Sequence, residues 1–216
     1  VEADCYDEDS FERTLAEKMR ELGRLYRGAG YGGMFYRWLM SDHMQAYNSF
    51  GNGSAMRVSP TAYAVDTLED VERLARWSAE VTHNHPEGVK GAQAVAAAIF
   101  LARTGSSKDE IKRYIEDKYY DLDFTLDDIR EGYSFDVTCQ GSVPQAIECF
   151  LEAEDYEDAI RNAVSLGGDA DTQAAMAGAI AEAFFGIPDE LQEEGLSYLD
   201  DTLQEYYWEY AEQLYQ

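Results

Sequence analysis

Basic side chains are scarce in this 216-residue sequence. It has 17 lysines and arginines against 43 aspartates and glutamates, a formal net charge of −26. Such a surface repels phosphate groups, which argues against direct binding of DNA or RNA. It favours a basic protein partner, although solubility alone would also explain the acidity. The acidic residues are spread along the chain rather than gathered in a tail, with dense stretches at 121–131, 152–158 and 189–194.

The sequence also lacks long apolar runs and paired cysteines. No window of 18 apolar residues exists, so we expect no membrane-spanning helix, and the acidic start VEADCYDEDS does not resemble a secretory signal. Because the chain starts at Val1 without a methionine, we expect either a processed start or a cut from a longer protein. The three cysteines, Cys5, Cys139 and Cys149, form no CxxC motif. We predict a reduced, cytoplasmic protein in which Cys139 and Cys149 are small buried side chains.

What the sequence does contain is a helical distribution of apolar residues, which make up 45% of the chain. Strand-like alternation never persists for six residues, and no repeat or linker divides the chain. We therefore predict an all-α fold in which residues 1–216 form a single domain. The expected helices cover 10–26 (with Ser10 as N-cap), 34–40, 67–82, 89–105, 106–120, a turn near 125–133, 142–154, 156–166, 173–185 and 190–214.

Three of these segments carry more specific expectations. The alanine-rich stretch 89–105 is apolar almost all round, which is typical of a central helix. The stretch 67–82 is amphipathic, and Ser107 with Glu110 resembles a capping box. The stretch 34–40, MFYRWLM, is expected to be a short buried helix.

The stretch GGDADTQAAMAG, residues 167–178, places two carboxylates and a hydroxyl at the start of a helix. In the turn before a helix Asp169 and Asp171 can converge, and Gly167 and Gly168 permit the positive φ that a tight approach needs. Oxygen ligands of this kind suit Mg²⁺ or Ca²⁺. Aspartates also favour helix starts as caps, however, and Asp169, Asp171 and Thr172 alone are too few ligands for such an ion.

Two further clusters could bind a ligand. In residues 47–57, Gly51 and Gly53 flank Asn52 and are expected to expose backbone N–H groups to an anion such as phosphate, although an ordinary turn is an equal alternative. Residues 82–88, THNHPEG, hold two of the three histidines. A zinc site is disfavoured there because no third ligand cluster is near in sequence. A polar loop with one histidine bonded to a ligand is the better interpretation.

Five ordered segments together resemble the ADP-ribosylglycohydrolase family: YGGMFYRWL, NSFGNGSAMRVSP, THNHPEGVKGA, TCQGSVPQAI and GGDADTQAAMAGAIAEAFFG. The resemblance implies an all-α domain that binds two Mg²⁺ ions and hydrolyses the bond joining ADP-ribose to a modified side chain. By the same resemblance Asp169, Asp171 and Thr172 are metal ligands and His83 contacts the ligand. The diphosphate-binding loop comprises Asn48, Ser49, Phe50, Gly51, Asn52 and Gly53.

One family feature is missing. The family carries a second metal-binding segment, a Thr-Asp-Asp-Thr run near its N-terminus, and no Thr-Asp-Asp occurs before Tyr31. Two fully bound Mg²⁺ ions are therefore not expected, and hydrolysis is expected to be impaired unless the missing half is supplied. Three alternatives remain open: a fragment of a working hydrolase, an acidic pseudoenzyme that occludes a basic nucleic-acid-binding complex or associates with itself, and a protein that only binds ADP-ribose.

Overall fold

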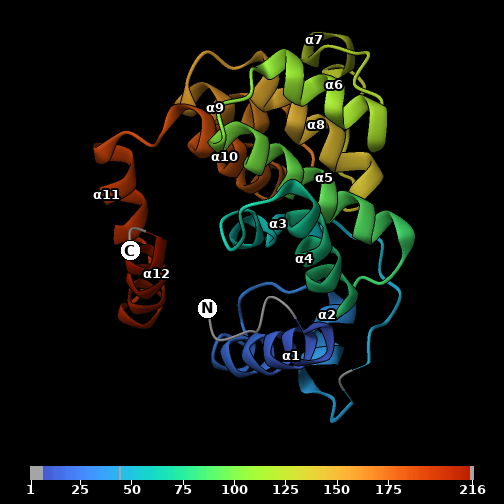
Figure 1. The fold of residues 1–216 in the computed structure, drawn as a ribbon, viewed down its shortest axis with the longest axis vertical. Helices are drawn as coiled ribbons and strands as arrows, with labels where there is room; N and C mark the ends of the chain where they lie inside the picture. The colour runs from blue at the N-terminus through green and yellow to red at the C-terminus, as the bar shows by residue number, and fades with distance from the viewer. Residues whose placement is uncertain (1–6, 44, 215–216) are drawn as a thin grey trace.

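The computed structural model describes residues 7–43 and 45–214 (Figure 1). Over these residues the protein is helical, and its one extended pairing is an isolated bridge between Gly51 and Thr138, so the predicted all-α fold is confirmed. Cys5 lies outside the described residues. The elements are α1 (Glu8–Leu25), α2 (Gly33–Met40), α3 (Gly53–Met56), η1 (Ser59–Ala62), α4 (Leu68–Glu80), α5 (Pro86–Arg103), α6 (Lys108–Lys118), α7 (Leu126–Ile129), α8 (Cys139–Glu152), α9 (Tyr156–Leu166), α10 (Ala170–Phe185), α11 (Asp189–Ser197) and α12 (Asp201–Leu214).

Helix α5 lies at the centre of the molecule, as its sequence predicts. It packs against α3, α4, α6, α8 and α10 (Figure 1), and most of its residues are buried. Its run of alanines leaves little side chain between neighbouring backbones, so helices can approach on several sides. Helix α4 covers one side of α5 with Val71, Leu74 and Trp77, which are all buried. The core therefore surrounds α5 and ends where the first turns of α5 and α10 reach the surface.

The N-terminal helices form a separate layer beneath α4 (Figure 1). Phe11 of α1 contacts Trp77 of α4 with ring centroids 5.8 Å apart. Arg20 is buried and donates hydrogen bonds to the backbone carbonyls of Ser41 and His43, which fixes the segment after α2. Helix α2 itself is only half buried, contrary to expectation. Its two buried residues are Trp38 and Leu39.

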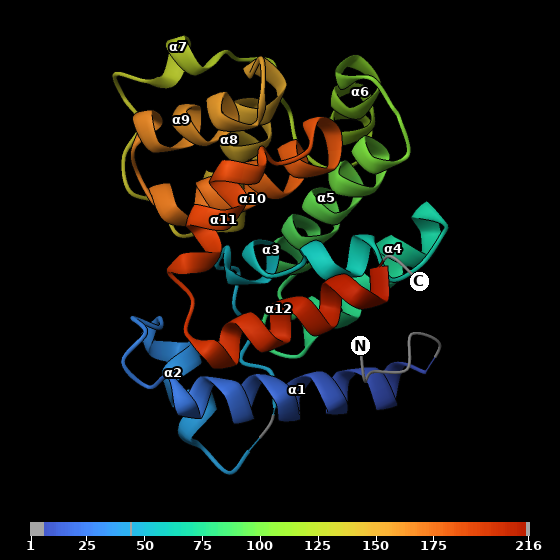
Figure 2. The ribbon, with the colours of Figure 1, turned by 90° about the vertical axis from the view of Figure 1, so that its left-hand side faces the viewer.

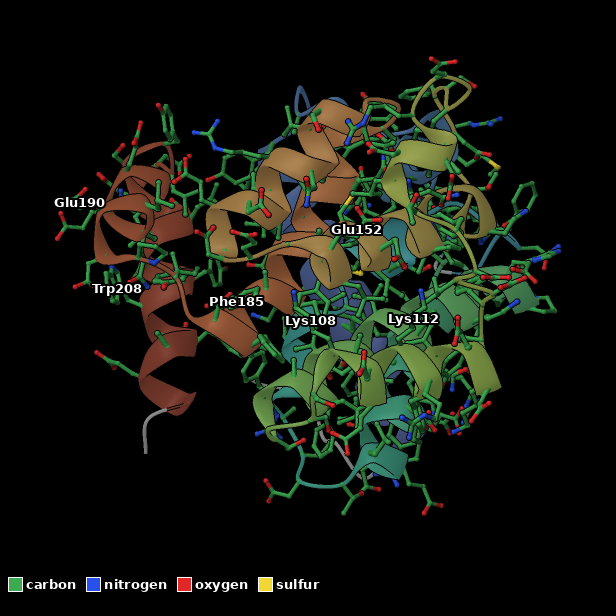
Figure 3. The ribbon with its side chains drawn as sticks, turned by 90° about the horizontal axis from the view of Figure 1, so that it is seen from above. Lys108, Lys112, Glu152, Phe185, Glu190 and Trp208 are labelled. Carbon is green, nitrogen blue, oxygen red and sulfur yellow. The ribbon has the colours of Figure 1, made fainter. Side chains whose placement is uncertain are left out.

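The last two helices form an arm, residues 189–214, beside the body. In the view of Figure 2, helix α12 crosses in front of the body at a height between α1 and the α3–α4 region. Tyr26 donates a hydrogen bond to Asp200, and Tyr210 donates one to the carbonyl of Pro60. From above, the labelled Glu190 and Trp208 lie to one side of the body (Figure 3). Helix α11 has no buried residue among those described. The body therefore does not depend on the arm for its core.

Several expected boundaries were wrong. The N-cap of α1 is Asp7, whose carboxylate accepts from the Ser10 N–H, rather than Ser10 itself. Helices α8 and α10 each begin three residues earlier than expected. The expected helix 190–214 is two helices, because Asp200 interrupts it and caps α12 by accepting from the Leu203 N–H at 3.0 Å.

Other local expectations are confirmed. The Ser107–Glu110 capping box is present at the start of α6. The next residue, Lys108, donates to the carbonyl of Leu151 at the end of α8 and lies 5.0 Å from the ring centroid of Phe185 (Figure 3). Cys139 and Cys149 are both buried and unpaired, and burial raises their thiol pKa values to about 11 and about 12. Within residues 7–43 and 45–214, none of the helices combines the length and the apolar character that a membrane span needs.

Candidate functional site

Buried polar side chains concentrate where the loop before α3 meets the first turns of α5, α8 and α10. We call this loop, residues 48–53, together with His83, the loop half of the site. Backbone hydrogen bonds attach the loop to the segment before α8: the Asn52 N–H donates to the Val137 carbonyl at 2.8 Å. The Cys139 N–H donates to the Phe50 carbonyl at 2.9 Å. The buried polar residues here are Ser49, Asn52, Ser54, Thr82, His83, Ser142 and Thr172.

The start of α5 closes the other side of the loop. The Ser54 hydroxyl donates to the Gly88 carbonyl at 2.7 Å. A Cβ atom at Gly88 would lie 2.6 Å from the Ser49 carbonyl oxygen and 2.8 Å from that of His83. Both are backbone atoms, which cannot turn aside as a side chain can. Glycine at position 88 is therefore what allows the loop, His83 and α5 to pack together.

The expected backbone anion cradle is only partly present. The Gly51 N–H donates to the Ser49 hydroxyl at 3.1 Å, and the Asn52 N–H is used by Val137. These two N–H groups therefore hold the loop itself. For Gly51 this corrects the expectation that its N–H faces a ligand. The left-handed backbone of the loop lies at Asn48 (φ +54°), whose N–H donates to the Asn84 side chain.

One side chain joins the loop to the predicted carboxylate cluster. The buried Asn52 amide donates to Asp169 Oδ2 at 2.7 Å and to Ser142 Oγ at 3.1 Å. Positions 52 and 169 are far apart in sequence, so this contact is a product of the fold. The two clusters that the sequence identified separately thus form one site.

We call Asp169, Asp171 and Thr172 the carboxylate half of the site. They stand at the start of α10 after two glycines with positive φ, +83° at Gly167 and +71° at Gly168, as the sequence predicts. Asp169 occupies the N-cap position but makes no side-chain cap hydrogen bond. Aspartates that precede other helices, such as Asp7 and Asp155, do cap them. Plain capping therefore does not account for Asp169.

The environment of Asp169 is that of a crowded carboxylate. Burial raises its pKa, the hydrogen bond from Asn52 lowers it, and the neighbouring Asp171 raises it again. Asp171 is exposed and accepts from the Thr172 N–H at 2.9 Å. The Thr172 hydroxyl lies 3.7 Å from the Met56 sulfur and also interacts with the Asp169 carboxylate, whose pKa this contact lowers. Two close carboxylates and a hydroxyl are the type of ligand that a hard cation binds. They supply fewer oxygens than the about six that such an ion prefers.

The two histidines of the 82–88 loop have separate roles. His83 is buried, its Nδ1 lies 2.7 Å from the Thr82 hydroxyl, and burial together with nearby Arg57 lowers its pKa to about 3. It is therefore neutral at physiological pH. His85 caps α5 by accepting from the Glu87 N–H, and its ring lies 5.3 Å from that of the half-exposed Phe50. Phe50 thus presents an apolar face beside the ring of His85.

Acidic groups elsewhere in the described residues do not form a competing centre. Glu8, Glu12 and Glu80 bring carboxylate oxygens within 4.8 Å of one another, but Arg76 pairs with Glu8 and Glu80 at 3.0 and 2.8 Å. Arg76 thus already offsets part of the negative charge of that group. Two open cavities of about 500 and 550 Å³ have no lining residue from the loop or from the carboxylate half, although Asn84, which accepts from the Asn48 N–H, lines the second. We place the site at the loop because its polar groups converge there, whereas the cavities are acidic surface hollows.

Sequence reasoning missed three contributors. Ser142 holds the Asn52 amide, Gly88 allows the close approach of α5, and Arg57 donates to the Gly53 carbonyl beneath the loop at 2.9 Å. Arg57 ends the GNGSAMR stretch, and Ser142 and Gly88 lie in segments that carried the family resemblance. Their part in the site depends on contacts across the fold, which no local spacing reveals.

Comparison with known proteins agrees with this geometry. The sequence profile of the family described as ADP-ribosylglycohydrolase matches residues 2–216. The human "ADP-ribosylhydrolase ARH3" is 33% identical, covering 85% of this chain and 66% of that protein. The Pseudomonas putida "ADP-ribosylarginine hydrolase Tri1" is 29% identical, covering 87% of this chain and 48% of that protein. This chain thus spans about half to two thirds of the length of these curated relatives.

A solved structure gives the same result for the fold. A chain from an "ADP-ribosylglycohydrolase-related protein complex" superposes with a TM-score of 0.67 at 25% identity, over 94% of this chain and 78% of that one. The family profile covers nearly the whole sequence, and the fold of the structural neighbour extends over the same helices. The chain belongs to the ADP-ribosylglycohydrolase family.

Proposed function

We propose that this protein binds ADP-ribose at the joined loop and carboxylate halves of the site, and that its hydrolase activity depends on Mg²⁺ and is slow because the carboxylate half supplies only part of the ion's ligands. The reaction is hydrolysis of the N- or O-glycosidic bond between ADP-ribose and a modified side chain. The observation that supports the proposal most is the Asn52–Asp169 hydrogen bond of 2.7 Å, which joins the loop at residues 48–53 to a pair of carboxylates. Family membership supports the same substrate class.

Each part of the site has a role in this proposal. Residues 48–53 would hold the diphosphate, with the charge of half-buried Arg57 beneath the loop attracting it. The neutral His83 would hydrogen-bond a ligand oxygen, and the exposed face of Phe50 would pack against a ring of the ligand. The buried hydrogen bonds behind the loop keep these groups in place before the ligand arrives, which reduces the entropy lost on binding.

The carboxylate half would hold Mg²⁺. Asp169, Asp171 and Thr172 would be its protein ligands, and relief of the repulsion between the two carboxylates would favour the ion. When bound, Mg²⁺ supplies a Lewis acid that polarises substrate oxygens. Because three protein oxygens fill only part of its shell, we expect one weakly held ion rather than two tight ones.

The decisive experiment is release of ADP-ribose from an ADP-ribosylated protein, with and without Mg²⁺, by the parent and by Asp169→Ala. Asp189→Ala, at the start of α11, is the matched control. We expect Mg²⁺-dependent release by the parent and the control, and a rate at least about tenfold lower for Asp169→Ala. Equal rates for all three proteins would contradict the assigned site.

A second candidate function is binding of a basic protein partner through the arm. Tyr198 is 80% exposed and Trp208 51% exposed, and both lie among acidic residues of α11 and α12. Exposed aromatic side chains are enriched in protein interfaces, and the surrounding charge favours a basic partner. This observation supports the binding-protein alternative without excluding ADP-ribose binding.

Tryptophan fluorescence tests the second function, because Trp38 and Trp77 are buried and Trp208 is exposed. Titration with a lysine-rich peptide at low salt should change the emission of the parent and leave Trp208→Phe unchanged. High salt should reverse the change. An unchanged parent spectrum at low salt would remove the arm from consideration.

A further inference from the structure

Arg57 occupies an unusual position behind the loop half. Its guanidinium donates to the carbonyls of Gly53 at 2.9 Å and Ser78 at 3.0 Å, and to the Thr82 hydroxyl at 2.9 Å. All three acceptors are uncharged, and one belongs to the last turn of α4, where the helix dipole favours a cation. Burial lowers the Arg57 pKa to about 10, which still leaves it charged at neutral pH. A fixed positive charge therefore lies next to Thr82.

The Thr82 hydroxyl connects this charge to His83. Thr82 is fully buried, and its Oγ1 lies 2.7 Å from His83 Nδ1. An arginine N–H can only donate, so it uses an acceptor lone pair of Oγ1. The single hydrogen of Thr82 is then left for Nδ1.

Electrostatics favours the same assignment. A hydrogen on Nδ1 would turn the positive edge of the imidazole toward the guanidinium, whereas a lone pair there is attracted to it. The opposite nitrogen, Nε2, faces the loop: Cβ atoms at Gly51 and Gly53 would lie 3.6 and 3.3 Å from it. Within the described residues Nε2 has no hydrogen-bond partner. The missing side chains at these two glycines leave it open to a ligand.

We propose that Arg57 and Thr82 are positioning residues that fix His83 as the neutral tautomer with its hydrogen on Nε2. His83 is thereby a permanent hydrogen-bond donor toward the loop, suited to a phosphate or ribose oxygen, and not a general base. This assignment deepens the proposed function, on which its ligand rests, although the tautomer itself is a property of the free protein. The relay runs from the Arg57 N–H to Thr82 Oγ1, and from the Thr82 O–H to His83 Nδ1.

Nitrogen-15 NMR of histidine-labelled, ligand-free protein tests the relay directly, because protonated and unprotonated ring nitrogens have different chemical shifts. We expect His83 in the parent to show a protonated Nε2 and an unprotonated Nδ1 at neutral pH. Thr82→Ser, which keeps the hydroxyl, should give the same pattern. Thr82→Val, which lacks it, should show a mixture of tautomers. A protonated Nδ1 in the parent would overturn the proposal even if Thr82→Val failed to fold.

Calorimetric titration with ADP-ribose adds the functional readout. Thr82→Val should bind at least about fivefold more weakly than the parent, and Thr82→Ser within about twofold, because only the first loses the hydroxyl. Equal losses in both variants would mean that Thr82 acts through packing, and would overturn the positioning role. Failure of the parent to bind ADP-ribose would contradict the proposed function alone, since the NMR pattern is measured without ligand.

Discussion

The loop half and the carboxylate half of the candidate site are supported in different ways. In the loop half and directly behind it the polar groups are held by partners: Asn52, Ser54 and Thr82 are buried and hydrogen-bonded to neighbouring elements. In the carboxylate half Asp171 is exposed, and Asp169 has an elevated pKa and a single bond across to the loop. The loop half is therefore held by buried hydrogen bonds to the rest of the fold. In the carboxylate half, Asp169 and Asp171 repel each other. We therefore expect mutations in the loop half to lower the free energy of unfolding, and mutations in the carboxylate half to weaken ion binding.

The largest loss of stability is expected for Asn52→Ala. The change removes the donor that joins the two halves and leaves Asp169 and Ser142 without it. We expect a loss of about 2–3 kcal/mol in the free energy of unfolding, measured by urea denaturation, together with loss of ADP-ribose binding. Asn162→Ala is the control, because that amide makes one longer bond, 3.3 Å, to the Cys149 carbonyl. An equal effect of the two changes would show that Asn52 has no special role.

Gly88→Ala should cost slightly less, about 2 kcal/mol, because its Cβ would press on two backbone carbonyls that can separate only if the loop moves. Thermal unfolding followed by circular dichroism measures the change. Gly33→Ala serves as the comparison, since nothing lies within 4 Å of its Cβ and the position begins α2. If Gly88→Ala unfolds at the temperature of the parent, the tight packing of loop and α5 is incorrect.

Because His83 is buried in its neutral state, we expect the free energy of unfolding to depend on pH, with an effect of intermediate size. Its pKa is about 3 in the folded protein against about 6.5 when exposed, so below pH 6.5 the unfolded chain binds a proton that the folded protein does not. Stability is then fully present above pH 6.5 and falls as the pH drops toward 3. When the pH is lowered from 7.5 to 5.5, the free energy of unfolding, measured by urea denaturation, should fall by about 1 kcal/mol more in the parent than in His83→Gln. Identical losses would place His83 in contact with solvent.

The smallest effect on stability is expected for Asp169→Ala. Removing this carboxylate deletes one hydrogen bond but also ends its repulsion with Asp171, so the free energy of unfolding should change by at most about 1 kcal/mol. Any rise in melting temperature on addition of Mg²⁺ should disappear in the variant. A loss as large as that of Asn52→Ala would mean that both halves are equally part of the core.

The sequence predicted the fold better than it predicted the site. Helical spacing located the central helix α5 and the amphipathic helix α4, because burial of one face dictates that pattern. The arm was mistaken for one helix, since the break at Asp200 depends on a local cap and a contact with Tyr26. Glycines and aspartates revealed each half of the site separately. Their contact through Asn52 and Ser142 could not be predicted, because it joins residues 90 and 117 positions apart.

Calorimetric titration with ADP-ribose, in the presence of Mg²⁺ and again with a chelator, tests the division between the two halves most directly. The account predicts that the parent binds under both conditions with a modest gain from Mg²⁺, and that Asp169→Ala retains the Mg²⁺-independent part while Asn52→Ala loses both. Heat indistinguishable from dilution for the parent at millimolar ADP-ribose, with and without Mg²⁺, would contradict it.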